Sequence, residues 1–107
     1  MLVELDVFSG RPNPRWELDE QSSQQLLHLQ VRLTTSRQAP LEPPGLGYRG
    51  FVYSDGSGQV RVYRGYVRTA REVLADPSFS IETFLLDRMP AEYAGLRASI
   101  AAELTPK

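Results

Sequence analysis

The sequence contains no cysteine and only one histidine, His28. The absence of cysteine excludes a disulfide framework, a thiolate metal site and a cysteine nucleophile. A hydrolytic triad would need His28 as its base, but helical periodicity places this residue on the polar side of a predicted helix, where we expect it to be solvated. We therefore predict no catalytic residue, no metal site and no cofactor, and we do not favour an enzyme.

Long apolar segments are also missing, because nowhere do about 18 apolar residues follow one another, as a membrane-spanning helix requires. Met1 leads directly into an alternating stretch, without the basic and apolar regions of a secretion signal. The length of 107 residues is typical of one domain, and 41% hydrophobic and 23% charged residues are ordinary for a globular chain. We expect residues 1–107 to form a single globular domain of a soluble, cytoplasmic protein that has no membrane partner.

Lysine occurs only at Lys107, so arginine supplies eleven of the twelve basic residues. The formal net charge of −1 hides an uneven distribution. Residues 48–71 contain five basic residues and one acidic residue, a net charge of +4, whereas both flanking segments are acidic. Guanidinium groups bind carboxylates and phosphates through paired hydrogen bonds. The middle of the chain is therefore the candidate region for contact with an acidic group.

An alternating pattern begins the chain. Val3, Leu5 and Val7 alternate with acidic residues, which predicts a half-buried strand over residues 2–8. A helix is predicted to follow Asp19, a suitable N-cap, and to run to about Leu33.

The predicted helix has an apolar arc formed by Leu26, Leu27, Leu29, Val31 and Leu33. Gln30 falls inside this arc. A buried glutamine needs hydrogen-bond partners, which loop backbone nearby can supply.

Residues 34–47 are rich in proline and glycine and show no periodic pattern, so we expect a loop that is functional, mobile or both. Two strand-like runs follow it, YRGFVYS at 48–54 and QVRVYRGYV at 59–67. The glycines of the connecting DGSG permit the positive φ angles of a tight hairpin turn. The sequence therefore predicts a β-hairpin, with a possible short extension near Tyr66 to Arg68.

The hairpin has two possible registers. With DGSG as a four-residue loop, Ser54 faces Gln59, Tyr48 lies over Gly65, and Arg49 faces Arg64, a like-charge pair that needs an acid such as Glu4 or Asp6, or a bound anion, close by. A two-residue turn at Asp55–Gly56 instead sets Tyr48 against Tyr63. Both registers give the same faces: a core face of Phe51, Tyr53, Val60 and Val62, and a second, more exposed face of Tyr48, Val52, Arg61 and Tyr63.

The last third predicts two helices. Asp76 or Ser80 can cap the first, Pro90 ends it, and a stripe of Tyr93, Leu96, Ile100 and Leu104 marks the second. The predicted fold is α+β: a small three- to four-stranded sheet built from a strand, a crossover helix and a β-hairpin, with two C-terminal helices packed on one face.

The connection FSGRPNPRW, residues 8–16, is conformationally restricted by two prolines. In a functional interpretation, Arg11, Asn13 and Trp16 of this preorganised loop contact a ligand. In a structural interpretation, the prolines hold the crossing from strand to helix, Asn13 bonds local backbone and Trp16 fills the core. We favour the structural interpretation for Trp16 and leave both open for Arg11.

Three functions follow from these residues. The first is a non-catalytic interaction module in which Arg11, Asn13, Arg49 and Arg64 recognise an acidic group on a protein or peptide partner, while the 34–47 loop adapts around it. The second is a single-stranded nucleic-acid binder, in which bases stack on the tyrosines of the hairpin and arginines contact phosphates. The third is an enzyme for a small anionic substrate, which requires a polar pocket with a perturbed carboxylate near these arginines. The complete set of candidate binding residues is Arg11, Asn13, Trp16, Tyr48, Arg49, Arg61, Tyr63 and Arg64.

Overall fold

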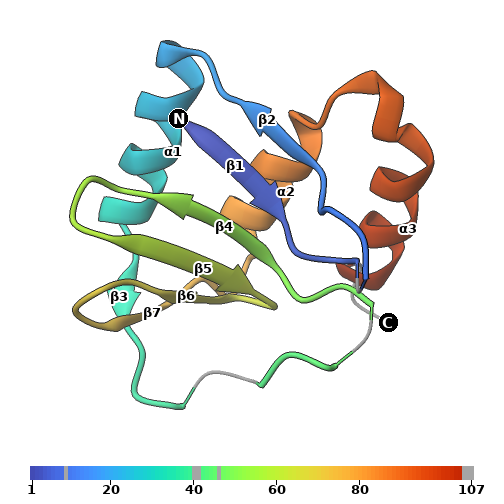
Figure 1. Cartoon of the computed structure of the whole chain (residues 1–107). Helices are drawn as coiled ribbons and strands as arrows, with labels where there is room; N and C mark the ends of the chain where they lie inside the picture. The colour runs from blue at the N-terminus through green and yellow to red at the C-terminus, as the bar shows by residue number, and fades with distance from the viewer. Residues whose placement is uncertain (9, 40–41, 46, 105–107) are drawn as a thin grey trace.

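The computed structural model describes residues 1–8, 10–39, 42–45 and 47–104, which form a curved sheet of seven strands and three α-helices (Figure 1). Each pair of neighbouring strands is antiparallel. The order across the sheet is β2-β1-β4-β5-β6-β7-β3. In chain order the strands are β1 (Leu2–Leu5), β2 (Arg15–Glu17), β3 (Thr34–Thr35), β4 (Phe51–Ser54), β5 (Gln59–Tyr63), β6 (Tyr66–Arg68) and β7 (Val73–Ala75).

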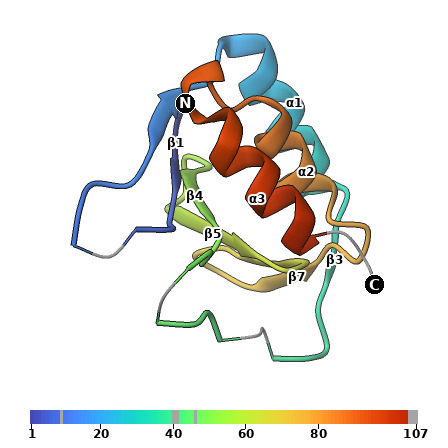
Figure 2. The same ribbon diagram turned by 90° about the vertical axis from the view of Figure 1, so that its right-hand side faces the viewer.

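The helices cover one face of the sheet. They are α1 (Glu20–Val31), α2 (Ser80–Asp87) and α3 (Ala94–Leu104), and a 3₁₀ turn (Ala91–Tyr93) precedes α3. The helix α2 lies in the middle and contacts α1, α3 and β5 (Figure 2). The opposite face of the sheet carries no described helix (Figures 1 and 2). The predicted α+β class and the two C-terminal helices are confirmed.

The sheet is larger than the three to four strands that the sequence predicts. The strands β2, β3 and β7 have only three, two and three residues, which is too short for an alternating pattern to be recognised. The chain therefore returns along β1 as β2 before α1 begins, so β1 is followed by a hairpin rather than by a crossing from strand to helix. Part of the predicted 34–47 loop is β3, and Pro40, Leu41 and Leu46 of that loop lie outside the described residues.

The central hairpin has the register of the four-residue loop. Phe51 pairs with Val62 and Ser54 with Gln59, and the predicted core face, Phe51, Tyr53, Val60 and Val62, is buried. Gly50 is required at the start of this hairpin, since a Cβ there would lie 2.1 Å from the carbonyl oxygen of Val62. The glycine of the first Tyr-Arg-Gly sequence, residues 48–50, therefore allows the chain to pass close to β5 just before β4 begins.

The second Tyr-Arg-Gly forms a turn instead, which corrects the prediction that residues 59–67 are one strand. Tyr63 pairs with Tyr66 across a two-residue loop, Arg64 and Gly65, whose φ angles are 45° and 84°. Two successive positive φ angles are typical of the type I′ hairpin turn. As a result, neither Arg64 nor Gly65 faces the residues of β4 that the extended register assigned to them.

A fully buried carboxylate stabilises this turn. Glu82 of α2 accepts hydrogen bonds from the backbone N–H groups of Arg64, at 3.0 Å, and Gly65, at 2.8 Å, and from the hydroxyl of Tyr48. Burial and then the charge of Glu82 raise the pKa of Tyr48, so its hydroxyl keeps the proton that it donates. The helix α2 thereby fixes the backbone of an arginine in a conformation that glycine normally adopts.

The helix α1 follows most of its sequence signals. Asp19 caps it by accepting a hydrogen bond from the N–H of Ser22 at 2.7 Å, and His28 is exposed, as predicted. Gln30 accepts from the hydroxyl of Tyr53 at 2.7 Å and donates to Asp55 at 3.0 Å, so side chains rather than loop backbone satisfy it. Val31, which the sequence places in the apolar arc, is 81% exposed, because it is the last residue of the helix.

The C-terminal helices begin and end near the predicted signals. Asp76 accepts hydrogen bonds from the Ser80 hydroxyl, at 2.8 Å, and from the N–H of Ile81, at 2.9 Å, at the start of α2. Pro90 separates α2 from the 3₁₀ turn and α3. Within the described part of the chain, every helix is too short or too polar to cross a membrane.

Candidate functional site

The uncovered face of the sheet carries a row of charged side chains. The strand registers align Arg15, Glu4, Val52, Arg61, Arg68 and Val73 across six neighbouring strands. We call this surface, together with Asp6 and Arg49, the open face. Arg61 and Arg68 are directly opposite one another on β5 and β6. Like charges at such positions repel unless an anion lies nearby.

Asp6 is the acid at the centre of the open face. Its Oδ1 lies 2.7 Å from Nη2 of Arg49 and its Oδ2 lies 2.7 Å from Nη1 of Arg61. Burial by itself would raise the pKa of Asp6, but the hydrogen bonds and charges of Arg61 and Arg49 outweigh it and hold this pKa below 3.8. The sequence analysis offers Glu4, Asp6 or a bound anion as the partner of Arg49 and Arg64; in the structure Asp6 is the acid, and it contacts Arg49 and Arg61.

Arg68 differs from its neighbours in this cluster. It is exposed, and it forms no ion pair with any described carboxylate. The nearest acid in the row, Glu4, already accepts from Nε of Arg15 at 2.9 Å. The side chain of Arg61 keeps 38% of its surface exposed despite its contact with Asp6. The open face thus has donor groups that remain accessible to an acidic ligand.

The residues of the first connection have mainly structural contacts. Asn13 accepts hydrogen bonds from the N–H groups of Val7, at 3.0 Å, and Phe8, at 2.8 Å, and donates to Glu4 at 3.0 Å. Trp16 is buried in the core, as the structural interpretation requires. Arg11 is exposed, with its guanidinium carbon 3.8 Å from the centroid of the Phe8 ring. Of the predicted residues in this loop, Arg11 is the one at the surface.

Tyr48 and Tyr63 are not at the surface, which corrects their predicted placement. They are 4% and 9% exposed, and their ring centroids lie 5.7 Å apart. Both residues are beside the point where the chain turns at Arg64, so the alternation of the hairpin faces ends there. Neither ring offers a free face for base stacking. Arg64 itself donates to the Tyr63 hydroxyl at 3.2 Å and to the carbonyl oxygen of Glu103 at 3.4 Å, away from the open face.

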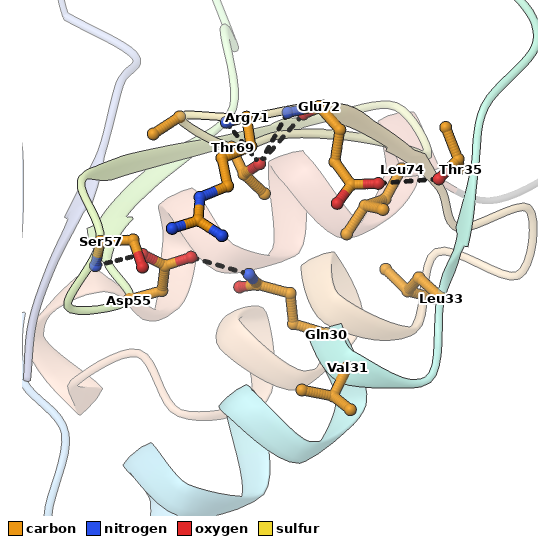
Figure 3. A pocket seen from close by; sticks show the side chains of 11 residues that line it. Gln30, Val31, Leu33, Thr35, Asp55, Ser57, Thr69, Arg71, Glu72 and Leu74 are labelled. Atoms are coloured by element: carbon orange, nitrogen blue, oxygen red, sulfur yellow. Dashed lines mark hydrogen bonds between the residues drawn. The ribbon is translucent and has the colours of Figure 1, made fainter.

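A cavity of about 250 Å³ with a mixed polar and apolar lining lies between the end of α1, the β4–β5 turn and the β6–β7 turn (Figure 3). No local pattern in the sequence indicates this cavity, because its residues come from three separate segments, 30–35, 55–57 and 69–74. The polar lining comprises Gln30, Thr35, Asp55, Ser57, Thr69, Arg71 and Glu72, and the apolar lining comprises Val31, Leu33, Ala70 and Leu74. In Figure 3 the side chains of Arg71 and Glu72 extend into it.

Both carboxylates of the cavity are oriented by neutral partners. Asp55 accepts from the N–H of Ser57 at 2.9 Å and from Nε2 of Gln30 at 3.0 Å, and these hydrogen bonds lower its pKa. Oε1 of Glu72 accepts from the hydroxyl of Thr35 at 2.7 Å. The lowered pKa of Asp55 keeps this carboxylate ionised near neutral pH, so Asp55 can bind a cationic group but has no proton to donate as a general acid. The described residues contain no group of three or more side chains placed to hold a metal ion.

Comparison of the chain with protein-family models, with curated protein sequences and with solved structures finds no match.

Proposed function

We propose that this protein is a non-catalytic interaction module that binds an acidic protein or peptide segment on the open face of its sheet. The observation that carries this proposal is the cross-strand pair of Arg61 and Arg68, which share no carboxylate between them. A partner with carboxylate side chains would relieve the repulsion between the two guanidinium groups.

The balance of charge at the centre of the open face supports the same partner. Arg49, Arg61 and Arg68 carry three positive charges, and Asp6 supplies one negative charge among them. Asp6 also restrains the side chains of Arg49 and Arg61. Side chains that are held before binding lose less conformational entropy when they contact a partner.

The open face also offers apolar contacts between its charges. Val52 and Val73 are half-buried and belong to the same row as Arg61 and Arg68. An extended segment has side chains that alternate at a period of two. A partner strand with acidic residues at every second position would therefore turn its carboxylates together toward the open face, where their methylene groups contact Val52 and Val73.

The arginines that we assign to the acidic group differ in part from those predicted from the sequence. Asn13 is engaged within the fold and Arg64 is directed to the C-terminal side of the molecule, so the acidic group is assigned to Arg49, Arg61 and Arg68, with Arg11 at the adjacent loop. The aromatic surface required by the nucleic-acid alternative is reduced, because Tyr48 and Tyr63 are buried. The protein-binding function is therefore the better supported of the two.

The test is an NMR titration of the ¹⁵N-labelled protein with a synthetic peptide of alternating glutamate and valine. We expect amide shifts in β4, β5 and β6, and a dissociation constant that rises with salt. The substitution Arg68→Ser should raise this constant about three- to tenfold. Arg97→Ser, which removes an exposed arginine of α3, is the matched control and should leave it unchanged.

Three outcomes would contradict the proposal. They are the absence of shifts with the glutamate peptide, equal affinity for a peptide of alternating glutamine and valine, and equal affinity of the Arg68→Ser variant. Retardation of labelled oligothymidine by the protein, weakening with salt, would instead support the nucleic-acid alternative.

A further inference from the structure

The cavity of Figure 3 presents one cation and two anions within a small volume. Arg71 extends into it and forms no ion pair with any described carboxylate. Oε2 of Glu72 receives no hydrogen bond from the described residues, whereas Oε1 is occupied by Thr35. The groups that remain open are therefore the guanidinium of Arg71 and one oxygen of Glu72.

The turn that supplies both groups is held by its own hydrogen bonds. The hydroxyl oxygen of Thr69 accepts from the N–H groups of Arg71, at 3.2 Å, and Glu72, at 3.1 Å, and Thr69 N–H donates to the carbonyl oxygen of Glu72 at 2.9 Å. This arrangement fixes the backbone from which the two charged side chains start. A site with a fixed backbone needs less ordering when a ligand enters.

The apolar residues that line the cavity indicate the size and the apolar part of the ligand. Val31 is 81% exposed at the rim, and Leu33 and Leu74 add apolar surface on one side of the cavity. An exposed apolar residue beside a cavity offers contact area for an apolar group of a ligand. The volume of about 250 Å³ is below the range of roughly 300–1,000 Å³ that holds drug-sized molecules, so the ligand must be small.

We propose that this cavity binds a small zwitterion, an α-amino acid with a short apolar side chain. The carboxylate of the ligand pairs with the guanidinium of Arg71, and its ammonium group donates to Oε2 of Glu72. Asp55 also lines the cavity, and its negative charge favours a ligand that carries a positive group. The apolar side chain lies against Val31, Leu33 and Leu74. This site is separate from the open face and does not depend on the function proposed for it.

The experiment is an NMR titration of the ¹⁵N-labelled protein with three probes of similar size: L-leucine, L-leucinamide and N-acetyl-L-leucine. The amide lacks the carboxylate, and the N-acetyl form lacks the ammonium group. We expect L-leucine to shift the amides of residues 30–33, 55–58 and 69–74, and the other two probes to bind at least about tenfold more weakly.

Two variants localise the binding. Arg71→Gln and Glu72→Gln should each weaken L-leucine binding at least about tenfold, since each removes one of the two charge-assisted hydrogen bonds. Arg97→Gln is the control for loss of an exposed arginine and should bind as the unsubstituted protein does. Unchanged dispersion of the amide spectrum shows that each variant is folded.

The proposal is overturned if L-leucine causes no shifts at about 10 mM, ten times a millimolar dissociation constant. Equal binding of L-leucinamide would show a site for cations only, and equal binding of N-acetyl-L-leucine a site for anions only. Either result, or unchanged affinity in both glutamine variants, also contradicts a zwitterion site.

Discussion

Oδ2 of Asp6 lies 2.7 Å from Nη1 of Arg61, although 55 positions separate the two residues in the chain. The other oxygen of the same carboxylate contacts Arg49 at 2.7 Å. One acid therefore connects the residue after β1 to the segment before β4 and to the middle of β5. Without it, two guanidinium groups would lie close together with no charge between them.

The substitution Asp6→Asn should lower the free energy of unfolding at neutral pH by about 1–3 kcal/mol, between the values for exposed and buried ion pairs. The side chain of Asp6 is 14% exposed, so solvent screens the pair only in part. Urea denaturation measures the loss. Asp87→Asn, which removes an exposed carboxylate of α2, is the control and should change the stability little.

This loss should depend on pH in a defined direction. Because the pKa of Asp6 in the folded protein lies below 3.8, its contribution to stability is complete above the unfolded value and is lost as the pH falls through the folded value. The difference between the original protein and Asp6→Asn should therefore be constant at neutral pH and shrink in acid. A difference that grows as the pH falls below 3.8 would contradict the assigned role.

Gly65 and Gly47 allow a matched test of the β5–β6 turn, since both have a φ of +84°. A Cβ at Gly65 would lie 2.7 Å from Cε1 of Phe79 and 3.1 Å from the carbonyl oxygen of Asp76, whereas a Cβ at Gly47 meets no atom within 4 Å. Gly47→Ala should lower the free energy of unfolding by about 1–2 kcal/mol, because alanine is strained at this positive φ angle. Gly65→Ala should cost at least about 1 kcal/mol more because of the added contacts. Equal losses in thermal or urea denaturation would show that the space around Gly65 is not restrictive.

Glu82 and Tyr48 form a pair whose coupling can be measured. Glu82→Gln keeps the size of the side chain but turns an amide N–H group toward groups that are themselves donors, such as the Tyr48 hydroxyl. We therefore expect the free energy of unfolding to fall by about 1–3 kcal/mol. Tyr48→Phe removes one donor and should cost about 1 kcal/mol. In a double-mutant cycle the combined loss should be smaller than the sum of the single losses, because both changes remove the same hydrogen bond. Additive losses would show that the two side chains do not interact.

The elements predicted from the sequence are those with a repeated pattern or a clear boundary residue. The alternation of Val3 and Leu5, the Asp19 cap and the break at Pro90 all correspond to the structure. The DGSG loop limited the hairpin to two registers, and the structure has the one with the four-residue loop. Such signals act over a few residues and are visible in one stretch of sequence.

The features that the sequence does not predict depend on contacts between distant segments. The turn at Arg64 and Gly65 is stabilised by Glu82, which lies in a helix whose position the local sequence does not specify. The strands β2 and β3 exist because they pair with β1 and β7, and the cavity at Arg71 and Glu72 forms only where three segments meet. Asp6 was one of two acids predicted near the arginines, with Glu4 as the other, but its contact with Arg61 could be identified only from the strand order.

The two outermost strands of the sheet have consequences for how copies of the chain behave in a concentrated solution. They are β2, with three residues, and β3, with two residues, and such short strands expose few unpaired backbone groups to a neighbouring molecule. Long exposed edges act as templates for aggregation, and short ones interrupt it. The short outer strands β2 and β3 thus limit strand-to-strand association at the margins of the sheet.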